Sequence, residues 1–281
     1  MIIDRGEDMV VLAMQNLVIR DFRTKAVLVN GINFTLERNS CLAIVGESGS
    51  GKTVILKAIL GLTNPSLEAS GSVFFDGIDL LQAKGEMIRR IRGRRICMIL
   101  QDPLTAFDPV YTIGNQMAET LCEHLQISKK EAMKRSLFEL QRMNIGEPLD
   151  VLKKYPHQLS GGMLQRCMIA IVMAMKPEII IADEPTTALD SINQNEVLAE
   201  FQKIRNEYRT SLIFVSHDLK IAQSLADYVL VLKDGKQVEY GRAEDIFSHP
   251  KHEYTKYLLN SRDKVTEAFI KAMSLGIRNN D

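Results

Sequence analysis

Residues 46–53 constrain this chain more than any other segment, because they read Gly-Glu-Ser-Gly-Ser-Gly-Lys-Thr. The spacing matches a loop that joins a strand to a helix and surrounds phosphates with backbone N–H groups. Its glycines let the backbone come close to an anion. The lysine would place a cation on the β- and γ-phosphates, and the threonine hydroxyl would coordinate Mg²⁺. The predicted phosphate-binding residues are Gly46, Glu47, Ser48, Gly49, Ser50, Gly51, Lys52 and Thr53.

The sequence on both sides of the loop supports this interpretation. Residues 40–45 form an apolar run of strand length, and residues 54–60 have helical character before Gly61 and Pro65. The alternative is a glycine-rich turn that binds no ligand. A strand before the loop and a helix after it favour phosphate binding over such a turn.

Composition and charge exclude several other classes of protein. The chain has 281 residues, of which 46% are hydrophobic and 25% charged, as in ordinary globular domains. A formal net charge of zero gives no global attraction to nucleic acid or anionic lipid. The four cysteines lack the C-x-x-C spacing of a zinc or redox site. We therefore expect the protein to reside in a reducing cytoplasm. The longest apolar run, residues 167–175, is too short to span a bilayer, and no signal segment is expected.

Apolar runs of strand length alternate with helical patterns and predict an α/β fold. A continuous apolar run that ends in an acid, residues 178–183, is typical of a central parallel strand. The Asp-Gly pair at 234–235 indicates a hairpin. The other expected strands cover residues 10–19, 27–36, 71–77, 96–100, 212–215, 229–232 and 237–240, and a helix is expected over 195–208.

Two further segments need interpretation. Residues 112–158 form a helical insert, because Ile113, Met117, Leu121 and Leu125 recur every four positions and Ser128 opens a capping box with Glu131.

Residues 89–95 hold five arginines, which could indicate a nucleic-acid patch. Because the charge of the chain balances and an apolar run follows at once, we favour a solvated edge before a buried strand.

A second chemical constellation follows the strand at 178–183. Asp183 ends that strand, and Glu184 comes directly after it. In enzymes with a phosphate-binding loop, the first acid at such a strand end holds Mg²⁺. An adjacent acid can orient or deprotonate the water that attacks the γ-phosphate. A polar strand cap is the alternative, but the loop at 46–53 favours the catalytic interpretation.

Residues 159–162 read Leu-Ser-Gly-Gly, and with them the chain resembles the nucleotide-binding subunit of ATP-binding-cassette (ABC) transporters. The resemblance covers nearly the whole chain, and the motifs occur in the family order. It implies a single domain over 1–281, built as a P-loop NTPase (RecA-like) core with an antiparallel N-terminal β-subdomain. It also implies an inserted α-helical subdomain at about 102–160 and a C-terminal tail at about 246–281.

The resemblance also implies residue roles. Glu184 would be the general base, His217 the switch histidine near the γ-phosphate, and Lys52 a source of charge stabilisation. Gln101 would contact Mg²⁺ or the attacking water and face the permease, so that the expected Mg²⁺ residues are Thr53, Gln101 and Asp183. Residues expected to act at the dimer interface are Ser160, Gly161 and Gly162, which would bind ATP held by the opposite protomer, and Asp190. Phe22 is the candidate for stacking on adenine, with a core position as the alternative.

Within the family, the chain is most similar to the peptide and nickel branch. Met163 replaces the usual glutamine after Gly-Gly, as in nickel and metal-chelate members, and residues 101–109 and 248–255 point to the same branch. No cysteine follows Cys167, so an extension with an iron–sulfur cluster is not expected, and the tail resembles D-type subunits. His249 and His252 are too loosely spaced to predict a metal site.

The expected function is ATP hydrolysis that drives uptake of nickel or a metal–metallophore chelate, with ATP and Mg²⁺ bound. Import of di- or oligopeptides is the alternative, and a soluble non-transport cassette ATPase is a remote one. The expected partners are a second, distinct ABC ATPase, two transmembrane permeases and an extracytoplasmic solute-binding protein, but no nucleic acid. The expected location is the cytoplasmic face of the cell membrane.

Overall fold

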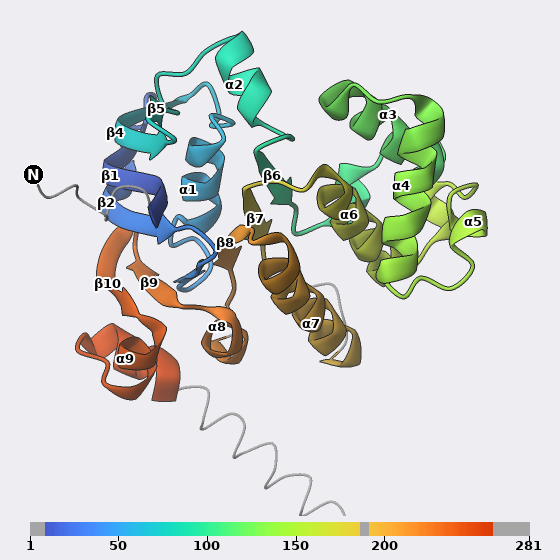
Figure 1. Cartoon of the computed structure of the whole chain (residues 1–281). Coiled ribbons are helices and arrows are strands. Elements are labelled where there is room, and N and C mark those ends of the chain that lie inside the picture. Colours follow the sequence, from blue (N-terminus) through green and yellow to red (C-terminus); the bar gives the residue numbers. More distant parts are fainter. Residues whose placement is uncertain (1–8, 186–190, 218, 261–281) are drawn as a thin grey trace, which may run out of the picture.

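The computed structural model describes residues 9–185, 191–217 and 219–260, and ten strands of this part form one sheet (Figure 1). The α/β class and the expected strands are confirmed. In order across the sheet, the strands are β5 (Ile78–Asp79), β4 (Leu67–Phe75), β1 (Val10–Asp21), β2 (Val27–Glu37), β10 (Lys236–Arg242), β9 (Tyr228–Lys233), β3 (Cys41–Val45), β8 (Ser211–Val215), β7 (Ile179–Asp183) and β6 (Ile96–Ile99).

The strands β3, β8, β7 and β6 are parallel and form the centre of the α/β core. Every residue of β3, β7 and β8 is buried, as expected for parallel strands with both faces covered. Successive side chains point to opposite faces. Ile179 and Ile181 therefore pack with helix α1 (Lys52–Ile59), whereas Ile180 and Ala182 pack with α6 (Gly161–Met175) and α7 (Ser191–Tyr208).

The antiparallel strands β1, β2, β4 and β5 form an N-terminal wing, which agrees with the expected β-subdomain. The wing joins the rest of the sheet through a parallel pairing of Asn30 in β2 with Lys236 in β10. The hairpin between β9 and β10 turns at Asp234 and Gly235, where φ is 47° and 73°. Positive φ at both positions is typical of a type I′ turn, which the Asp-Gly pair predicted.

A helical insert lies between β6 and α6, at one side of the sheet (Figure 1). Its elements are η2 (Pro103–Ala106), α3 (Ile113–Leu125), α4 (Lys129–Arg142), α5 (Pro148–Val151) and η3 (Pro156–Gln158). Ser128 caps α4 as predicted, because its hydroxyl accepts a hydrogen bond from Glu131 N. The predicted apolar stripe is buried at 113, 117 and 121 and partly buried at 125.

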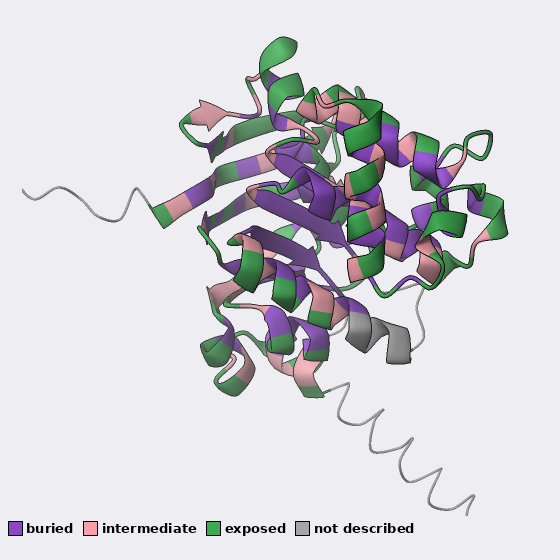
Figure 2. Cartoon of the chain, turned by 45° about the vertical axis from the view of Figure 1, so that its right-hand side comes forward, coloured by how far each residue is buried: buried purple, intermediate pink, exposed green. Residues whose placement is uncertain are grey.

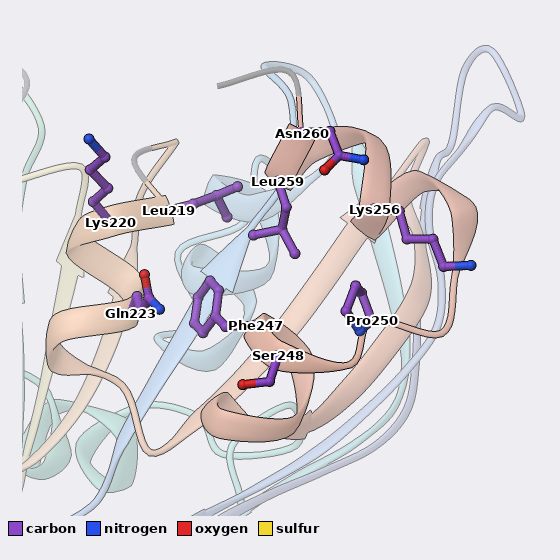
Figure 3. Close-up of a pocket in the computed structure, with 9 residues that line it drawn as sticks. All are labelled: Leu219, Lys220, Gln223, Phe247, Ser248, Pro250, Lys256, Leu259 and Asn260. Atoms are coloured by element: carbon purple, nitrogen blue, oxygen red, sulfur yellow. The ribbon is translucent and has the colours of Figure 1, made fainter. Parts of the chain in front are cut away.

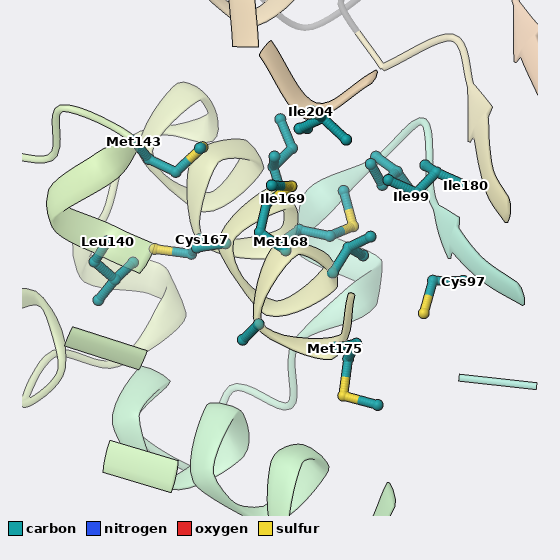
Figure 4. Packing of buried hydrophobic residues seen from close by; sticks show 14 of the residues in the cluster. Cys97, Ile99, Leu140, Met143, Cys167, Met168, Ile169, Met175, Ile180 and Ile204 are labelled. Carbon is teal, nitrogen blue, oxygen red and sulfur yellow. The ribbon is translucent and has the colours of Figure 1, made fainter. Parts of the chain in front are cut away.

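Helix α6 holds the insert and the sheet in one hydrophobic cluster. Figure 4 shows α6 between Leu140 and Met143 of the insert and Ile99 and Ile180 of the sheet. Because the buried residues are continuous across α6, the insert depends on the sheet for its core. Figure 2 shows the same distribution, with buried strands inside and exposed outer helix faces.

The remaining helices are α2 (Glu86–Ile91), α8 (Leu219–Leu225), α9 (Ala243–Ser248) and a helical segment over 253–260. In the arginine cluster, Arg89 pairs with Glu123, and Arg95 pairs with Glu178 and Asp76. These ion pairs support the interpretation of 89–95 as a structural edge. Among the described helices, none is both long and apolar enough to cross a membrane.

Gly71 provides a test of the wing. It has a φ of 99°, and a Cβ there would lie 2.4 Å from Asn16 O and 2.6 Å from Gln15 O. We expect Gly71→Ala to lower the free energy of unfolding by about 3 kcal/mol, since it combines strain with a backbone clash. Gly77→Ala is the control, because φ is 75° there and nothing lies within 4 Å of the added Cβ.

The control should lower the free energy of unfolding by only about 1 kcal/mol, from backbone strain alone. Urea denaturation of both variants measures the difference. Equal losses for Gly71→Ala and Gly77→Ala would contradict the packing of β4 against β1.

Candidate functional site

The loop at 46–53 connects β3 to α1 at the carboxyl end of the parallel strands. Gly49 and Gly51 have φ values of 82° and 99°, which favour glycine. A Cβ on Gly46 would lie 2.3 Å from Leu232 O, so no side chain fits there. Gly51 precedes α1 without a side-chain cap, so the first N–H groups of the helix remain available to an anion. This arrangement can bind phosphates.

The Lys52 side chain is held inside the loop by two backbone carbonyls. Its side chain is buried, and its Nζ donates hydrogen bonds to Gly46 O and Glu47 O at 2.8 Å each. Burial lowers the pKa of Lys52, although the charges of Glu184, Asp183 and Glu47 oppose this shift. A buried ammonium that is bound only to carbonyls would gain from a phosphate anion beside it.

Thr53 and Asp183 form a pair of oxygen ligands next to the loop. The Thr53 hydroxyl donates to Asp183 Oδ2 at 2.9 Å. Burial raises the pKa of Asp183, and the hydrogen bond from Thr53 opposes part of that shift. A hydroxyl and a desolvated carboxylate suit a hard divalent cation such as Mg²⁺. The residues present therefore fit the ion that the sequence predicts.

Three of the predicted catalytic side chains meet at one oxygen atom. Gln101 Nε2 donates to Glu184 Oε2 at 3.1 Å, and His217 Nδ1 lies 3.3 Å from the same oxygen. These residues follow β6, β7 and β8, whose carboxyl ends lie at one edge of the sheet. Glu184 has a φ of 44°, and its N–H donates to Val215 O. The strand ends thus place a carboxylate, an amide and an imidazole together.

Other predicted residues lie apart from this group or outside the description. Ser160 caps α6 by accepting a hydrogen bond from Met163 N at 3.3 Å, and Ser160 and Gly161 are exposed. Phe22 is 56% exposed in the turn after β1, which excludes the core alternative, and Lys25 Nζ lies 4.5 Å from its ring centroid. Asp190 lies outside the described residues.

Two long-range contacts were not predicted from the sequence, one at the opposite end of α1 and one at the phosphate-binding loop. Arg92 donates from its guanidinium to Leu60 O and Gly61 O, at the carboxyl end of α1. The Tyr254 hydroxyl accepts a hydrogen bond from Glu47 N. An arginine cluster and a lone tyrosine carry no local signal for such long-range contacts. His252, by contrast, makes a local contact, because its Nδ1 accepts a hydrogen bond from Tyr254 N.

This fold and these side chains define an ATPase with a phosphate-binding loop. The sequence model of the family described as "ABC transporter" matches residues 29–187, which is more than half of the chain. The chain therefore belongs to the ABC transporter family, and it is an ATP-binding, ATP-hydrolysing subunit of an import system.

Several relatives support this assignment. The chain is 42% identical over 265 residues to the metal-staphylopine import system ATP-binding protein CntD of Staphylococcus aureus (strain NCTC 8325 / PS 47), covering 94% of this chain and 98% of the relative. It is also 42% identical over 270 residues to the dipeptide transport ATP-binding protein DppD of Lactococcus lactis subsp. cremoris (strain MG1363), covering 94% and 77%.

Solved structures give the same result for the fold. A dimeric ATP-binding cassette in a post-hydrolysis state, bound to ADP and Pi, matches with a TM-score of 0.74 and 27% identity. The match covers 83% of this chain and 98% of that chain. A cassette from the cbiONQ transporter of Clostridium perfringens matches with a TM-score of 0.72 and 26% identity, covering 86% and 92%.

The buried Asp183 carboxylate lowers the stability of the folded protein at neutral pH. Because its pKa is raised in the folded protein, its ionised form costs stability, and protonation removes this cost as the pH falls through the folded pKa. We expect Asp183→Asn, whose amide oxygen can still accept from Thr53, to raise the free energy of unfolding by about 1 kcal/mol at neutral pH. The gain should shrink toward about pH 4, the ordinary range of an aspartate.

Urea unfolding of the nucleotide-free protein at both pH values tests this expectation. Asp150→Asn is the control, because the Asp150 carboxylate is 61% exposed and pairs with the exposed Lys153. A gain for Asp183→Asn that does not depend on pH would contradict the desolvation of Asp183.

Proposed function

We propose that this chain hydrolyses ATP to drive uptake of a metal bound to a small chelating molecule. The convergence of Gln101, Glu184 and His217 beside a phosphate-binding loop supports the hydrolytic part. For the cargo, support comes from the similarity to the metal-staphylopine import ATPase along nearly the full length of both chains. Dipeptide import is the second candidate, because a dipeptide transport relative is equally identical.

Binding of the triphosphate would use groups that are already arranged. The N–H groups at 46–53 would surround the phosphates, and Lys52 Nζ would exchange its carbonyl partners for phosphate oxygens. Ser50 Oγ is buried and has no hydrogen-bond partner among the described residues, so a phosphate oxygen would satisfy it. Phe22 would stack on the adenine ring, as its exposure permits.

Thr53, Asp183 and Gln101 would hold Mg²⁺. The ion, when bound, neutralises charge on the β- and γ-phosphates. Asp183 would then stay ionised at neutral pH, because a nearby cation favours the charged form of a carboxylate.

Glu184 would act as the general base. Its Oε2 would accept a proton from the attacking water while the water oxygen forms a bond to the γ-phosphorus and the bond to the β–γ bridging oxygen breaks. Gln101 and His217 would hold the carboxylate and the water in line with the phosphate. Lys52 would stabilise the charge that develops on the phosphate oxygens.

A complete site would need a second cassette. The exposed start of α6, with Ser160, Gly161 and Gly162, would contact the γ-phosphate of ATP held by the opposite cassette, and Asp190 would lie in the loop that crosses the interface. We propose that this second cassette is a distinct chain. Two transmembrane permeases and an external solute-binding protein would complete the importer, with this chain at the cytoplasmic face of the membrane and Gln101 toward a permease.

Glu184→Gln tests the assignment of the base. The variant should bind ATP with near wild-type affinity, since the amide keeps the shape of the side chain, but lose turnover by about 100-fold or more. The control is Glu178→Gln, at the opposite end of β7, where the carboxylate pairs with Arg95 and Arg38. ATP binding and phosphate release should be measured in the assembled transporter. Normal turnover by Glu184→Gln would refute the role of Glu184.

Uptake measurements test the cargo. We expect cells that lack this chain to lose accumulation of ⁶³Ni supplied with a metallophore, and cells that carry Glu184→Gln to show the same loss. Labelled dipeptide is the parallel substrate. Loss of dipeptide uptake with normal metal uptake would favour the second candidate and reject the first.

A further inference from the structure

The helical segment 253–260 contacts the phosphate-binding loop, although more than 200 positions separate them in the sequence. Glu47 N donates a hydrogen bond to the Tyr254 hydroxyl, and the donor and acceptor lie 3.2 Å apart. Glu47 is the second residue of the loop. A side chain near the end of the described chain thus satisfies a backbone donor of the nucleotide site.

The structure fixes Tyr254 firmly. The Glu239 carboxylate of β10 accepts hydrogen bonds from Lys251 N at 2.8 Å and His252 N at 3.1 Å, which anchors the start of the helical segment. The Tyr254 side chain is only 6% exposed and packs with buried residues of β3 and β9. Lys233 Nζ lies 5.0 Å from its ring centroid. Because the ring is held in one place, its hydroxyl offers a fixed acceptor to the Glu47 N–H of the loop.

Tyr254 and Lys52 hold the same residue of the loop from two directions. Tyr254 accepts from Glu47 N, and Lys52 donates to Glu47 O. If Lys52 turns to the phosphates, as in the proposed function, Glu47 O loses this partner. The hydrogen bond to Tyr254 does not involve Lys52, so it can keep the Glu47 peptide in place while ATP binds.

The other flank of the helical segment is open. A pocket of about 450 Å³ lies between α8, α9 and this segment. Figure 3 shows residues that line it, among them Lys256, Leu259 and Asn260. The segment is therefore not enclosed on that side. Its packing on β3 and its hydrogen bonds to β10 and Glu47 keep it in position.

We propose that Tyr254 is a positioning residue for ATP binding, which keeps the phosphate-binding loop in the conformation that receives the phosphates. Without its hydroxyl, the Glu47 N–H would lose its acceptor, and the loop would spend part of its time in conformations that pair this donor elsewhere. ATP would then bind only to the competent fraction, so its apparent dissociation constant would rise by the inverse of that fraction. Chemistry at Glu184 would be unaffected once ATP is bound.

Tyr254→Phe tests the proposal, because it removes one oxygen atom and keeps the ring. Tyr257→Phe is the matched control on the same segment, where the side chain is 59% exposed and stacks with Tyr254. We expect Tyr254→Phe to weaken ATP binding about 5-fold, as for loss of one ordinary hydrogen bond, and to raise the KM for ATP of the assembled transporter similarly. The kcat should not change, and Tyr257→Phe should match the wild type.

Hydrogen–deuterium exchange of the peptide that contains residues 46–53 gives an independent readout. Exchange should be faster in nucleotide-free Tyr254→Phe than in the wild type or Tyr257→Phe. Two results would overturn the proposal: unchanged ATP affinity and loop exchange in Tyr254→Phe, or a loss of kcat at unchanged KM. Failure of the proposed function would look different, because the wild-type transporter itself would not hydrolyse ATP.

Discussion

The site depends on the register of four parallel strands. Pairing of Ile44 with Val215, of Asp183 with Val215 and of Ile99 with Ala182 brings β3, β8, β7 and β6 to an end at one edge of the sheet. The segments that carry the chemistry follow directly from these ends. A shift of one residue in β7 would move Asp183 and Glu184 away from their partners and would exchange the two faces of the strand. Packing of alternate isoleucines against α1 and α6 resists such a shift.

Two charged side chains at this edge of the sheet are buried, which is unfavourable, and bound nucleotide with Mg²⁺ would offset this cost. Burial acts against the charged forms of both Lys52 and Asp183, as their shifted pKa values indicate. The positive φ of Glu184 adds backbone strain, which is common at functional sites. Burial of the large hydrophobic clusters on both faces of the sheet stabilises the fold and offsets these unfavourable contributions. Bound phosphates would bring negative charge to Lys52, and a bound divalent cation would bring positive charge to Asp183.

Local patterns in the sequence predicted much of this architecture. The phosphate-binding loop, the buried strands and the Asp-Gly hairpin depend on short-range spacing, and all three are present. The pairing of Asn30 with Lys236, the contacts of Arg92 with the end of α1 and the bond from Glu47 to Tyr254 were not predictable in this way. Each joins segments far apart in the chain, so it depends on the finished fold. The same holds for the meeting of Gln101 and His217 at one oxygen of Glu184.

We propose that each ATP site needs two cassettes, so that the phosphate-binding loop of this chain serves one ATP and the start of its α6 serves another. The most direct test measures the rate of ATP hydrolysis per chain across a dilution series, alone and with the second ATPase and permeases. We expect that the diluted chain still binds ATP but hydrolyses it slowly, and that the rate per chain rises on assembly. A rate per chain that stays constant on dilution and equals that of the assembled transporter would contradict it.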